Sequence, residues 1–260
     1  MKLYFRYISL LLKSQLQYRA SFLIQVVTQF IQPFALTAGI FLLFDRFGSI
    51  DGWSLYEILM CYSVVGSSMA AAQCFARGVD KFPGMVQKGD FDRLLVRPRS
   101  ALFQVLVSDF DIKRIGMFVQ TLLVLAYAIY KAEIVWSVAK AVMLVNMLLG
   151  GTLIFSGVFL LEATAAFWTV ESLEVANIFT HGMKEHASYP LNIFPKWITY
   201  FFTFIIPFGT INYLPMRFML DRIDGIAWLY AFLPLLGGLF IIPCMFVWQI
   251  GVRRYASTGS

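Results

Sequence analysis

Six long stretches without a single charged side chain constrain this chain more than any other feature of its sequence. They cover residues 20–44, 58–76, 115–130, 141–161, 197–216 and 225–252. Stretches of about 20 residues match the length that a helix needs to cross a hydrocarbon core about 30 Å thick. A backbone in lipid must satisfy its hydrogen bonds internally, and the sequence lacks the ten-residue alternation typical of barrel strands. We therefore predict an all-α polytopic membrane protein with six transmembrane helices.

The composition indicates the same class of protein. Of the 260 residues, 59% are hydrophobic and 14% are charged, whereas soluble domains have about 45–50% apolar and about 25% charged residues. Six spans use close to half of the chain, so we expect a single transmembrane domain over residues 1–260. The cysteines lie in apolar stretches without metal-like spacing and are expected to be buried apolar residues. They are Cys61, Cys74 and Cys244.

Lysine and arginine are unevenly distributed between the loops. Most of the 21 basic residues precede the first span, lie in the loop of residues 77–114, or follow the last span. Because basic residues favour the cytoplasmic side of a membrane, we predict that both termini and this loop are cytoplasmic. The topology explains the formal charge of +6, so no nucleic-acid partner is expected.

Residues 1–19 have the pattern of an amphipathic helix and not that of a signal peptide. Lys2, Arg6, Lys13 and Gln17 share one helical face. The segment has neither an uncharged core of about 7–15 residues nor a small-residue cleavage site. We predict an interfacial helix on the cytoplasmic surface that leads into the first span.

The loop of residues 77–114 is longer than a connector between two spans needs to be. Within the run DFDRLLV, Asp90 and Asp92 near the start and Arg97 just beyond the end suit the dipole of a short helix, which Pro98 stops. A second partly apolar segment follows at residues 100–112. Two interpretations are open: an interfacial loop held by anionic lipid, or a docking element for a soluble partner.

Residues 162–196 are too polar for a lipid-facing helix and too aromatic for a typical loop. Either they are cytoplasmic and residues 197–216 form the fifth span, or residues 170–189 cross the membrane facing protein or water. In the second case the segment 190–220 is re-entrant on the outer side. Prolines that divide this segment into short pieces favour the second interpretation; they are Pro190, Pro195, Pro207 and Pro215.

Signatures of catalysis are missing from the sequence. It contains neither G-x-x-x-x-G-K-[ST] nor G-x-S-x-G. The run HGMKEH at residues 181–186 places its histidines five positions apart, so they do not share a helix face and no metal site is predicted. Polar residues in or near the spans either line a substrate pathway or are simply solvated. The candidates for such a pathway are Glu162, Glu171, Glu174 and His181.

Small residues gather in GSSMAAA at residues 66–72 and in GGTLIFSG at residues 150–157. Small side chains allow membrane helices to approach closely. We expect these clusters to pack helices together, within the chain or against a second subunit, and to have no catalytic role.

Together these features resemble the permease subunits of type-2 ATP-binding-cassette (ABC) exporters. The amphipathic N-terminal helix, the six spans and the structured loop after the second span carry the likeness, which covers essentially the whole chain. Three motifs are similar to those of a bacterial branch of these permeases. They are GDFDRLLVRPRSALFQVL, FWTVESLEVANIF and YPLNIFPKWITYFFTFIIPFGTINYLP.

The resemblance implies a permease in the bacterial cytoplasmic (inner) membrane that pairs with a second copy or with a sister permease. Two cytoplasmic ATPase subunits would bind ATP and Mg, and this chain itself would bind no cofactor. The coupling helix that docks on the ATPase would comprise Asp90, Phe91, Asp92, Arg93, Leu94, Leu95 and Arg97. The apolar members would be the anchors and the charged members would fix the register. The outer re-entrant segment would include Pro190, Phe194, Pro195, Trp197 and Pro207. The chain departs from the family in the polarity of its fifth span, which would contain Lys184, Glu185 and His186.

An ion-coupled secondary transporter is the principal alternative. Such a carrier needs ionisable residues near the bilayer centre and usually has internal repeats. No repeat is evident, and Glu162 is expected near the cytoplasmic headgroups because it lies at the end of a long apolar stretch. An integral membrane enzyme or a scaffold is the other alternative, but the sequence offers no set of nucleophile, base and metal ligands. An ATP-driven permease is therefore the predicted function.

Overall fold

The protein is a bundle of long helices. The structure, a computed structural model, describes residues 2–168, 180 and 182–255. Over these residues the chain forms helices and a single isolated bridge between Ile50 and Trp53, with no sheet. The long elements are α1 (Lys2–Leu16), α2 (Arg19–Phe47), α3 (Leu55–Phe75), α8 (Ile115–Lys131), α9 (Val138–Ala165), α13 (Ala227–Gly238) and α14 (Ile241–Arg254). The prediction of an all-α polytopic protein is confirmed.

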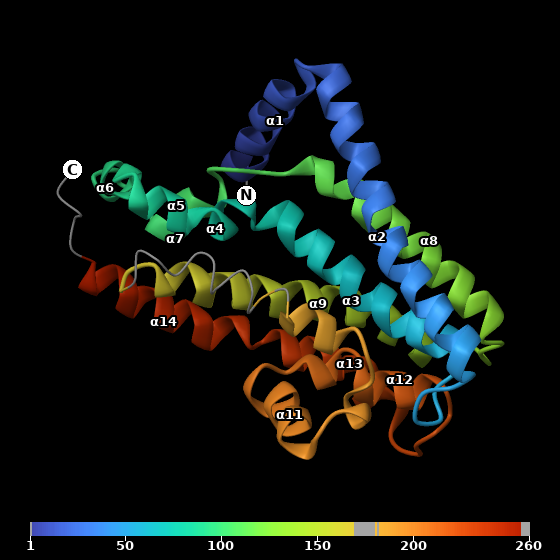
Figure 1. Cartoon of the computed structure of the whole chain (residues 1–260). Coiled ribbons are helices and arrows are strands. Elements are labelled where there is room, and N and C mark those ends of the chain that lie inside the picture. Colours follow the sequence, from blue (N-terminus) through green and yellow to red (C-terminus); the bar gives the residue numbers. More distant parts are fainter. Residues whose placement is uncertain (1, 169–179, 181, 256–260) are drawn as a thin grey trace.

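Five of the six predicted spans appear as helices long and apolar enough to cross a membrane. They are α2, α3, α8 with the turn before it, α9, and α13 continued by α14. α3 is central: 83% of its most apolar window is buried, and it packs against α8 on one side and α9 on the other. α9 in turn packs against α13 and α14, whereas α2 runs along α8 at the edge of the bundle (Figure 1). Only 17% of the corresponding window of α2 is buried, so most of its apolar surface faces lipid or another subunit.

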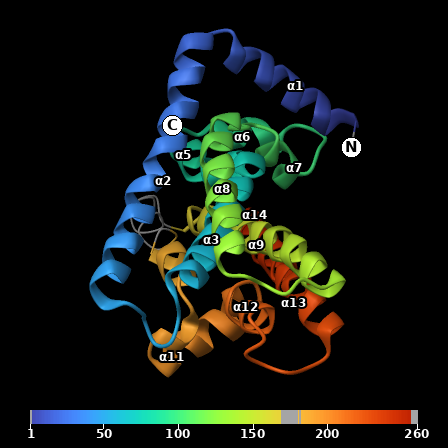
Figure 2. The ribbon, with the colours of Figure 1, turned by 90° about the vertical axis from the view of Figure 1, so that its right-hand side faces the viewer.

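The short helices gather at the two ends of the bundle. At one end, the loop end, α1 lies over α4 (Arg77–Asp80), α5 (Phe82–Gln87), α6 (Asp90–Leu95) and α7 (Ala101–Leu106), as Figures 1 and 2 show. The side-chain amide of Gln15 donates to the carbonyl of Phe110 and fastens α1 to this loop. Both α1 and the last turn of α14 belong to the loop end, and α11 (Lys196–Tyr200) and α12 (Tyr213–Met219) belong to the opposite end.

Small residues bring the central helices into close contact. A Cβ atom on Gly150 of α9 would overlap the carbonyl oxygen of Pro234 in α13, and one on Gly151 would overlap the hydroxyl of Ser68 in α3. Any larger side chain would therefore force the helix axes apart. The prediction that these small-residue clusters pack helices together is confirmed, and at these positions the packing is within the chain.

The segment of residues 190–220 enters and leaves the bundle at the same end. It consists of η2 (Leu191–Ile193), α11, a π-helical turn η3 (Phe201–Ile205), η4 (Phe208–Thr210) and α12. Its two halves are bent by 82°. At its start, Asn192 accepts a hydrogen bond from the indole N–H of Trp53 (3.1 Å). Just past its end, Asp221 binds Lys140, which lies in the first turn of α9 (2.7 Å).

Between these two anchors the segment reaches deep into the bundle. The ring of Phe208 lies 4.9 Å from that of Phe155, which is well inside α9. This geometry favours the re-entrant interpretation over a fifth span at residues 197–216. The alternative fifth span, residues 170–189, lies largely outside the described residues, because residues 169–179 and 181 are not among them.

Candidate docking platform and membrane cavity

The loop between α3 and α8 folds into four short helices that form a platform at the loop end of the bundle. The predicted helix in DFDRLLV is present as α6, and it begins after Gly89, whose φ of 70° suits glycine. α4 crosses α7 so closely that a Cβ on Gly78 would overlap the carbonyl of Val105. These helices are each too short to be stable alone, so tertiary contacts must hold the platform in shape.

An aromatic cluster packs α6 against the membrane helices. Phe91, which is fully buried, contacts Phe82 of α5 (ring centroids 4.9 Å apart) and Tyr255 at the end of α14 (5.0 Å). Phe82 in turn lies 4.8 Å from Trp248 of α14. Phe167, which follows α9, completes the cluster. Edge-to-face aromatic pairs of this kind each add about 0.5–1.5 kcal/mol to the burial term, so α6 is firmly joined to α14.

The buried position of Phe91 in this cluster differs from its predicted role as a docking residue. Phe91 was expected to anchor an ATPase subunit, but it has no exposed surface and is instead the anchor of α6 on its own bundle. Leu94 is partly buried against the same core. The apolar side chains that α6 and its following turn present to solvent are Leu95 (43% exposed) and Val96 (85% exposed).

Gln104 fixes the turn that follows α6. Its side-chain amide, buried within α7, donates to the carbonyl of Leu94 (3.0 Å) and to that of Arg99 (2.9 Å). These bonds join α7 to Leu94 in the last turn of α6, whose carbonyl also accepts from the backbone N–H of Arg97 (3.2 Å), and to Arg99 beyond it. The exposed tip of residues 95–99 is therefore held in one shape.

The tip of the platform is basic. Lys88, Arg93, Arg97 and Arg99 are exposed, and Asp90 lies 3.7 Å from Arg93. Asp92, on the other side of α6, faces Tyr255. Burial and this neighbouring carboxylate raise the pKa of the Tyr255 hydroxyl above its ordinary value of 10.0. The predicted register residues Arg93 and Arg97 are thus accessible to a partner, and Asp92 is turned towards the chain end.

Ionic contacts connect the platform to the first and third spans. Arg77, in α4, pairs with Asp80 and lies 3.6 Å from Asp111. Asp111 is also 3.9 Å from Arg114, whose guanidinium donates to Gln29 of α2 (2.8 Å). Partly buried pairs are screened less by salt than surface pairs, so this chain of contacts holds α4 to α2 and to the start of α8.

The predicted pathway residues lie in or next to the part of the chain that is only partly described. Glu162 is 9% exposed, and it accepts a hydrogen bond from the hydroxyl of Thr180 (2.7 Å). It is therefore packed inside protein, not solvated at the headgroups. Glu171, Glu174 and His181 lie outside the described residues.

A polar cavity lies inside the bundle between α2, α3, the start of α8 and the helical residues 182–187. It has a volume of about 180 Å³. Two cations and one carboxylate line it, together with two amides and four apolar side chains. These are Arg114, Lys184, Glu185, Gln32, Gln73, Pro33, Leu36, Met69 and Met117. Sequence reasoning missed this cavity because its members come from four distant segments.

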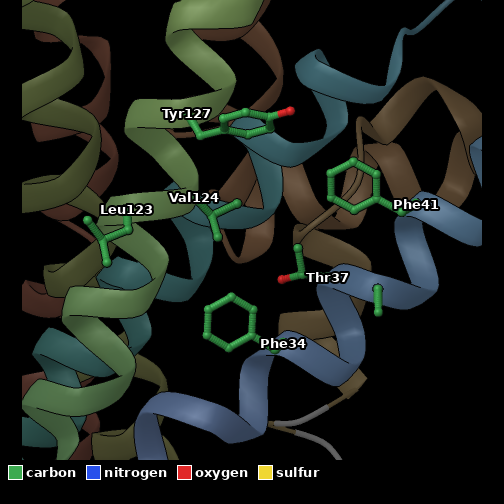
Figure 3. A pocket seen from close by; sticks show the side chains of 7 residues that line it. Phe34, Thr37, Phe41, Leu123, Val124 and Tyr127 are labelled. Atoms are coloured by element: carbon green, nitrogen blue, oxygen red, sulfur yellow. The ribbon is translucent and has the colours of Figure 1, made fainter.

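Two larger apolar grooves accompany it. One, of about 450 Å³, lies between α2 and α8, where Phe34, Phe41, Val124 and Tyr127 surround the hydroxyl of Thr37 (Figure 3). That hydroxyl donates to the carbonyl of Pro33 (3.1 Å), so its proton is not available to orient a ligand.

The other groove is also about 450 Å³ and adjoins the re-entrant segment, where Trp197, Ile198 and Phe202 face Met183 and His186. Nδ1 of His186 lies 2.8 Å from the carbonyl of Gly182, and its ring packs on that of Phe194 at 5.0 Å. Of the other predicted re-entrant residues, Pro190 precedes η2, Pro195 precedes α11 and Pro207 precedes η4.

Comparison with known proteins gives one match. A family model described as ABC-2 family transporter protein matches residues 30–259, which is most of the chain. No curated protein matches the chain. No solved structure matches it either.

Proposed function

Because this chain belongs to the ABC-2 transporter family and is a permease component of an ABC transporter, we propose that it forms the substrate pathway of an exporter as a dimer driven by two separate ATPase subunits. The dimer contains a second copy of this chain or a sister permease. The ATPase subunits bind ATP and Mg and dock on the platform of α4–α7. The observation that carries this proposal is the rigid, basic tip of residues 95–99, which is joined to the spans and is exposed among the residues that the structure describes.

The platform has the properties that a mechanical coupling element needs. A conformational change in a docked motor can act on the spans only through a connection that does not yield. The cluster around Phe91 joins α6 to α14, and the contacts of Arg77, Asp111 and Arg114 join α4 to α2 and α8. Closure of the ATPase dimer would then push on α6 and shift these three helices together.

The pathway lies at an interface with a second permease. α2 is mostly exposed, and α13 with α14 is only 33% buried in its most apolar window. Lipid can cover such faces, but a single chain of five or six spans offers no enclosed conduit of molecular size among its described cavities. Two copies facing each other would enclose one.

The proposed orientation places the platform and both termini in the cytoplasm of a bacterium. Lys88, Arg93, Arg97 and Arg99 gather at the loop end, and basic residues favour the cytoplasmic side. The re-entrant segment of residues 190–220 then lies at the outer face, where it would cap the exit.

Co-purification with the ATPase tests the docking surface. The permease and its ATPase are expressed together, and the ATPase recovered on a tagged permease is quantified. Val96→Glu places a charge on the exposed tip and is expected to reduce recovery at least about tenfold, because an unpaired charge in a docked apolar contact costs more than about 1.4 kcal/mol. Val135→Glu is the matched control, since Val135 is similarly exposed (76%) but lies between α8 and α9 at the opposite end. Undiminished recovery with Val96→Glu would refute the proposed docking surface.

A further inference from the structure

The polar cavity between α2, α3, α8 and residues 182–187 has a chemistry that the coupling mechanism does not require. Lys184 lies there with its side chain 8% exposed, and its Nζ is 3.4 Å from a carboxylate oxygen of Glu185. Nζ also lies 5.9 Å from the ring of Tyr62, whose hydroxyl donates to the carbonyl of Pro33 (3.3 Å). Tyr62 and Pro33 occupy the middle parts of α3 and α2. Pro33 lines the cavity in the middle of α2, whereas Gln73 and Arg114 line it near the loop-end termini of α3 and α8. The cavity therefore extends from the loop end into the spanning part of the bundle, where charged groups are costly and usually functional.

The described side chains that line the cavity carry a net charge of +1. Arg114 and Lys184 contribute two positive charges to its lining and Glu185 one negative charge, and Asp111, which compensates Arg114 at 3.9 Å, lies outside the lining. Among the described contacts, Glu185 accounts for one of the three N–H groups of Lys184. The amides of Gln32 and Gln73 supply further donors. An acceptor-rich anion suits this set of groups better than a cation does.

The size of the cavity limits what can enter it. About 180 Å³ is room for roughly six water molecules, each of which occupies about 30 Å³ in the liquid. Sites for whole drug-sized ligands measure about 300–1,000 Å³. A carboxylate or phosphate group with a few waters fits, whereas the apolar body attached to it must stay outside, against Leu36 on the exposed flank of α2.

A polar stripe on α2 leads from the loop end to the cavity. Ser21, Gln25, Gln29 and Gln32 recur at helical spacing in an otherwise apolar span. Gln25 donates to Ser21 (2.9 Å), and Gln29 accepts from Arg114 (2.8 Å). The stripe covers about 16 Å along the helix axis. A polar head can follow it inward from the membrane surface while its tail remains in lipid.

We propose that this cavity binds the compact anionic head, a carboxylate or a phosphate, of an amphiphilic substrate whose apolar tail stays in the bilayer. This inference rests on the proposed function, because it names the class of cargo that the permease would move. Arg114 then has a second role: it touches the head and, through Asp111 and Arg77, the platform, so an occupied cavity is in contact with the docking site.

Photolabelling of the permease alone tests the site. The full chain is placed in phosphatidylcholine nanodiscs and labelled with a laurate that carries a diazirine next to its carboxylate, and labelled peptides of α2 and α3 are quantified. Unlabelled laurate and dodecyl phosphate are expected to compete, and dodecyltrimethylammonium and acetate are not. Competition by the cation would overturn the charge assignment, and competition by acetate would show that a free small anion is the ligand. No ATPase is present, so a failed docking experiment and a failed labelling experiment are separate results.

Paired substitutions make the test independent of folding. Lys184→Gln removes a donor cation and is expected to lower labelling about tenfold at subsaturating probe, the value of one charge-assisted hydrogen bond. Glu185→Gln removes the negative charge from the same cavity and is expected to raise labelling severalfold, which a folding defect would not do. Lys196→Gln, at an exposed lysine before Trp197, serves as the control. Unchanged labelling with Lys184→Gln, or reduced labelling with both cavity variants, would overturn the proposal.

Discussion

Replacement of Phe91 by alanine should detach α6 from the bundle and let it unfold locally, while the membrane helices stay folded. The ring is fully buried against Phe82, Phe167, Trp248 and Tyr255, at centroid distances of 4.9, 5.6, 6.5 and 5.0 Å. Its burial contributes about 1.5–3 kcal/mol, and the edge-to-face pairs with Phe82 and Tyr255 add about 0.5–1.5 kcal/mol each. The total of about 2.5–6 kcal/mol brackets the usual cost of Phe→Ala in a core, about 3–5 kcal/mol.

Hydrogen–deuterium exchange measures this loss locally. α6 has six residues and cannot remain helical without its anchor. A loss of about 3 kcal/mol raises the fraction of open α6 more than 100-fold, and exchange of the peptide covering residues 88–100 should accelerate accordingly. Peptides from the first half of α3 should exchange as in the unchanged protein, because Ile58, Met60 and Val64 belong to a separate core cluster.

A conservative variant separates anchoring from simple disturbance of the core. Phe91→Leu keeps an apolar side chain in the pocket and should cost less than about 1.5 kcal/mol, so exchange should rise about tenfold or less. If Phe91→Ala left the exchange of residues 88–100 within about threefold of the unchanged protein, Phe91 would not be the anchor. The transmission of force from α6 to α14 would then need another explanation.

Two further predictions concern helix packing and the chain end. Gly150→Leu should lower the free energy of unfolding by at least about 1–3 kcal/mol, because the new side chain overlaps the carbonyl of Pro234. Gly39→Leu on α2 is the control: a Cβ there meets nothing within 4 Å, so the thermal midpoint in detergent should not change. Equal midpoints for both variants would contradict the close packing at Gly150. The raised pKa of Tyr255 means that its stabilising contribution is fully present below its ordinary value of 10.0 and is lost as pH rises through the higher folded value. The opening of α6, measured as its exchange rate divided by the intrinsic base-catalysed rate at the same pH, should therefore increase above that pH, and Tyr255→Phe, which cannot ionise, should abolish this increase. Persistence of the same alkaline transition in that variant would assign it to another group.

The spans and the existence of α6 were predictable because their causes are local. Lipid requires about 20 uncharged residues for each crossing. Five of the six charge-free stretches form helices long and apolar enough to span a membrane, and one of these is α13 continued by α14. The remaining charge-free stretch, residues 197–216, lies in the segment 190–220, whose prolines predict its division into short pieces. The structure shows these pieces as η2, α11, η3 and η4. α6 could be found from the charge pattern around DFDRLL, since dipole and breaker act within a few residues.

The orientation of α6 and the polar cavity were not predictable because their causes are distant in the sequence. Phe91 and Leu95 lie one turn apart on the same helix, yet Phe91 is buried by Trp248 and Tyr255 while Leu95 remains exposed. No local pattern specifies which of them the end of α14 will cover. The cavity likewise needs Arg114 and Lys184 to meet, which only the packed topology determines.

The aromatic pocket that holds α6 is completed only late in the synthesis of the chain. Phe91 leaves the ribosome long before Trp248 and Tyr255, which build the other half of its pocket. At a synthesis rate of about 5–20 residues per second, roughly 10–30 s separate the two. Throughout that interval the nascent chain carries an unfinished platform, so the proposed docking surface takes its final shape only after Trp248 and Tyr255 have been synthesised.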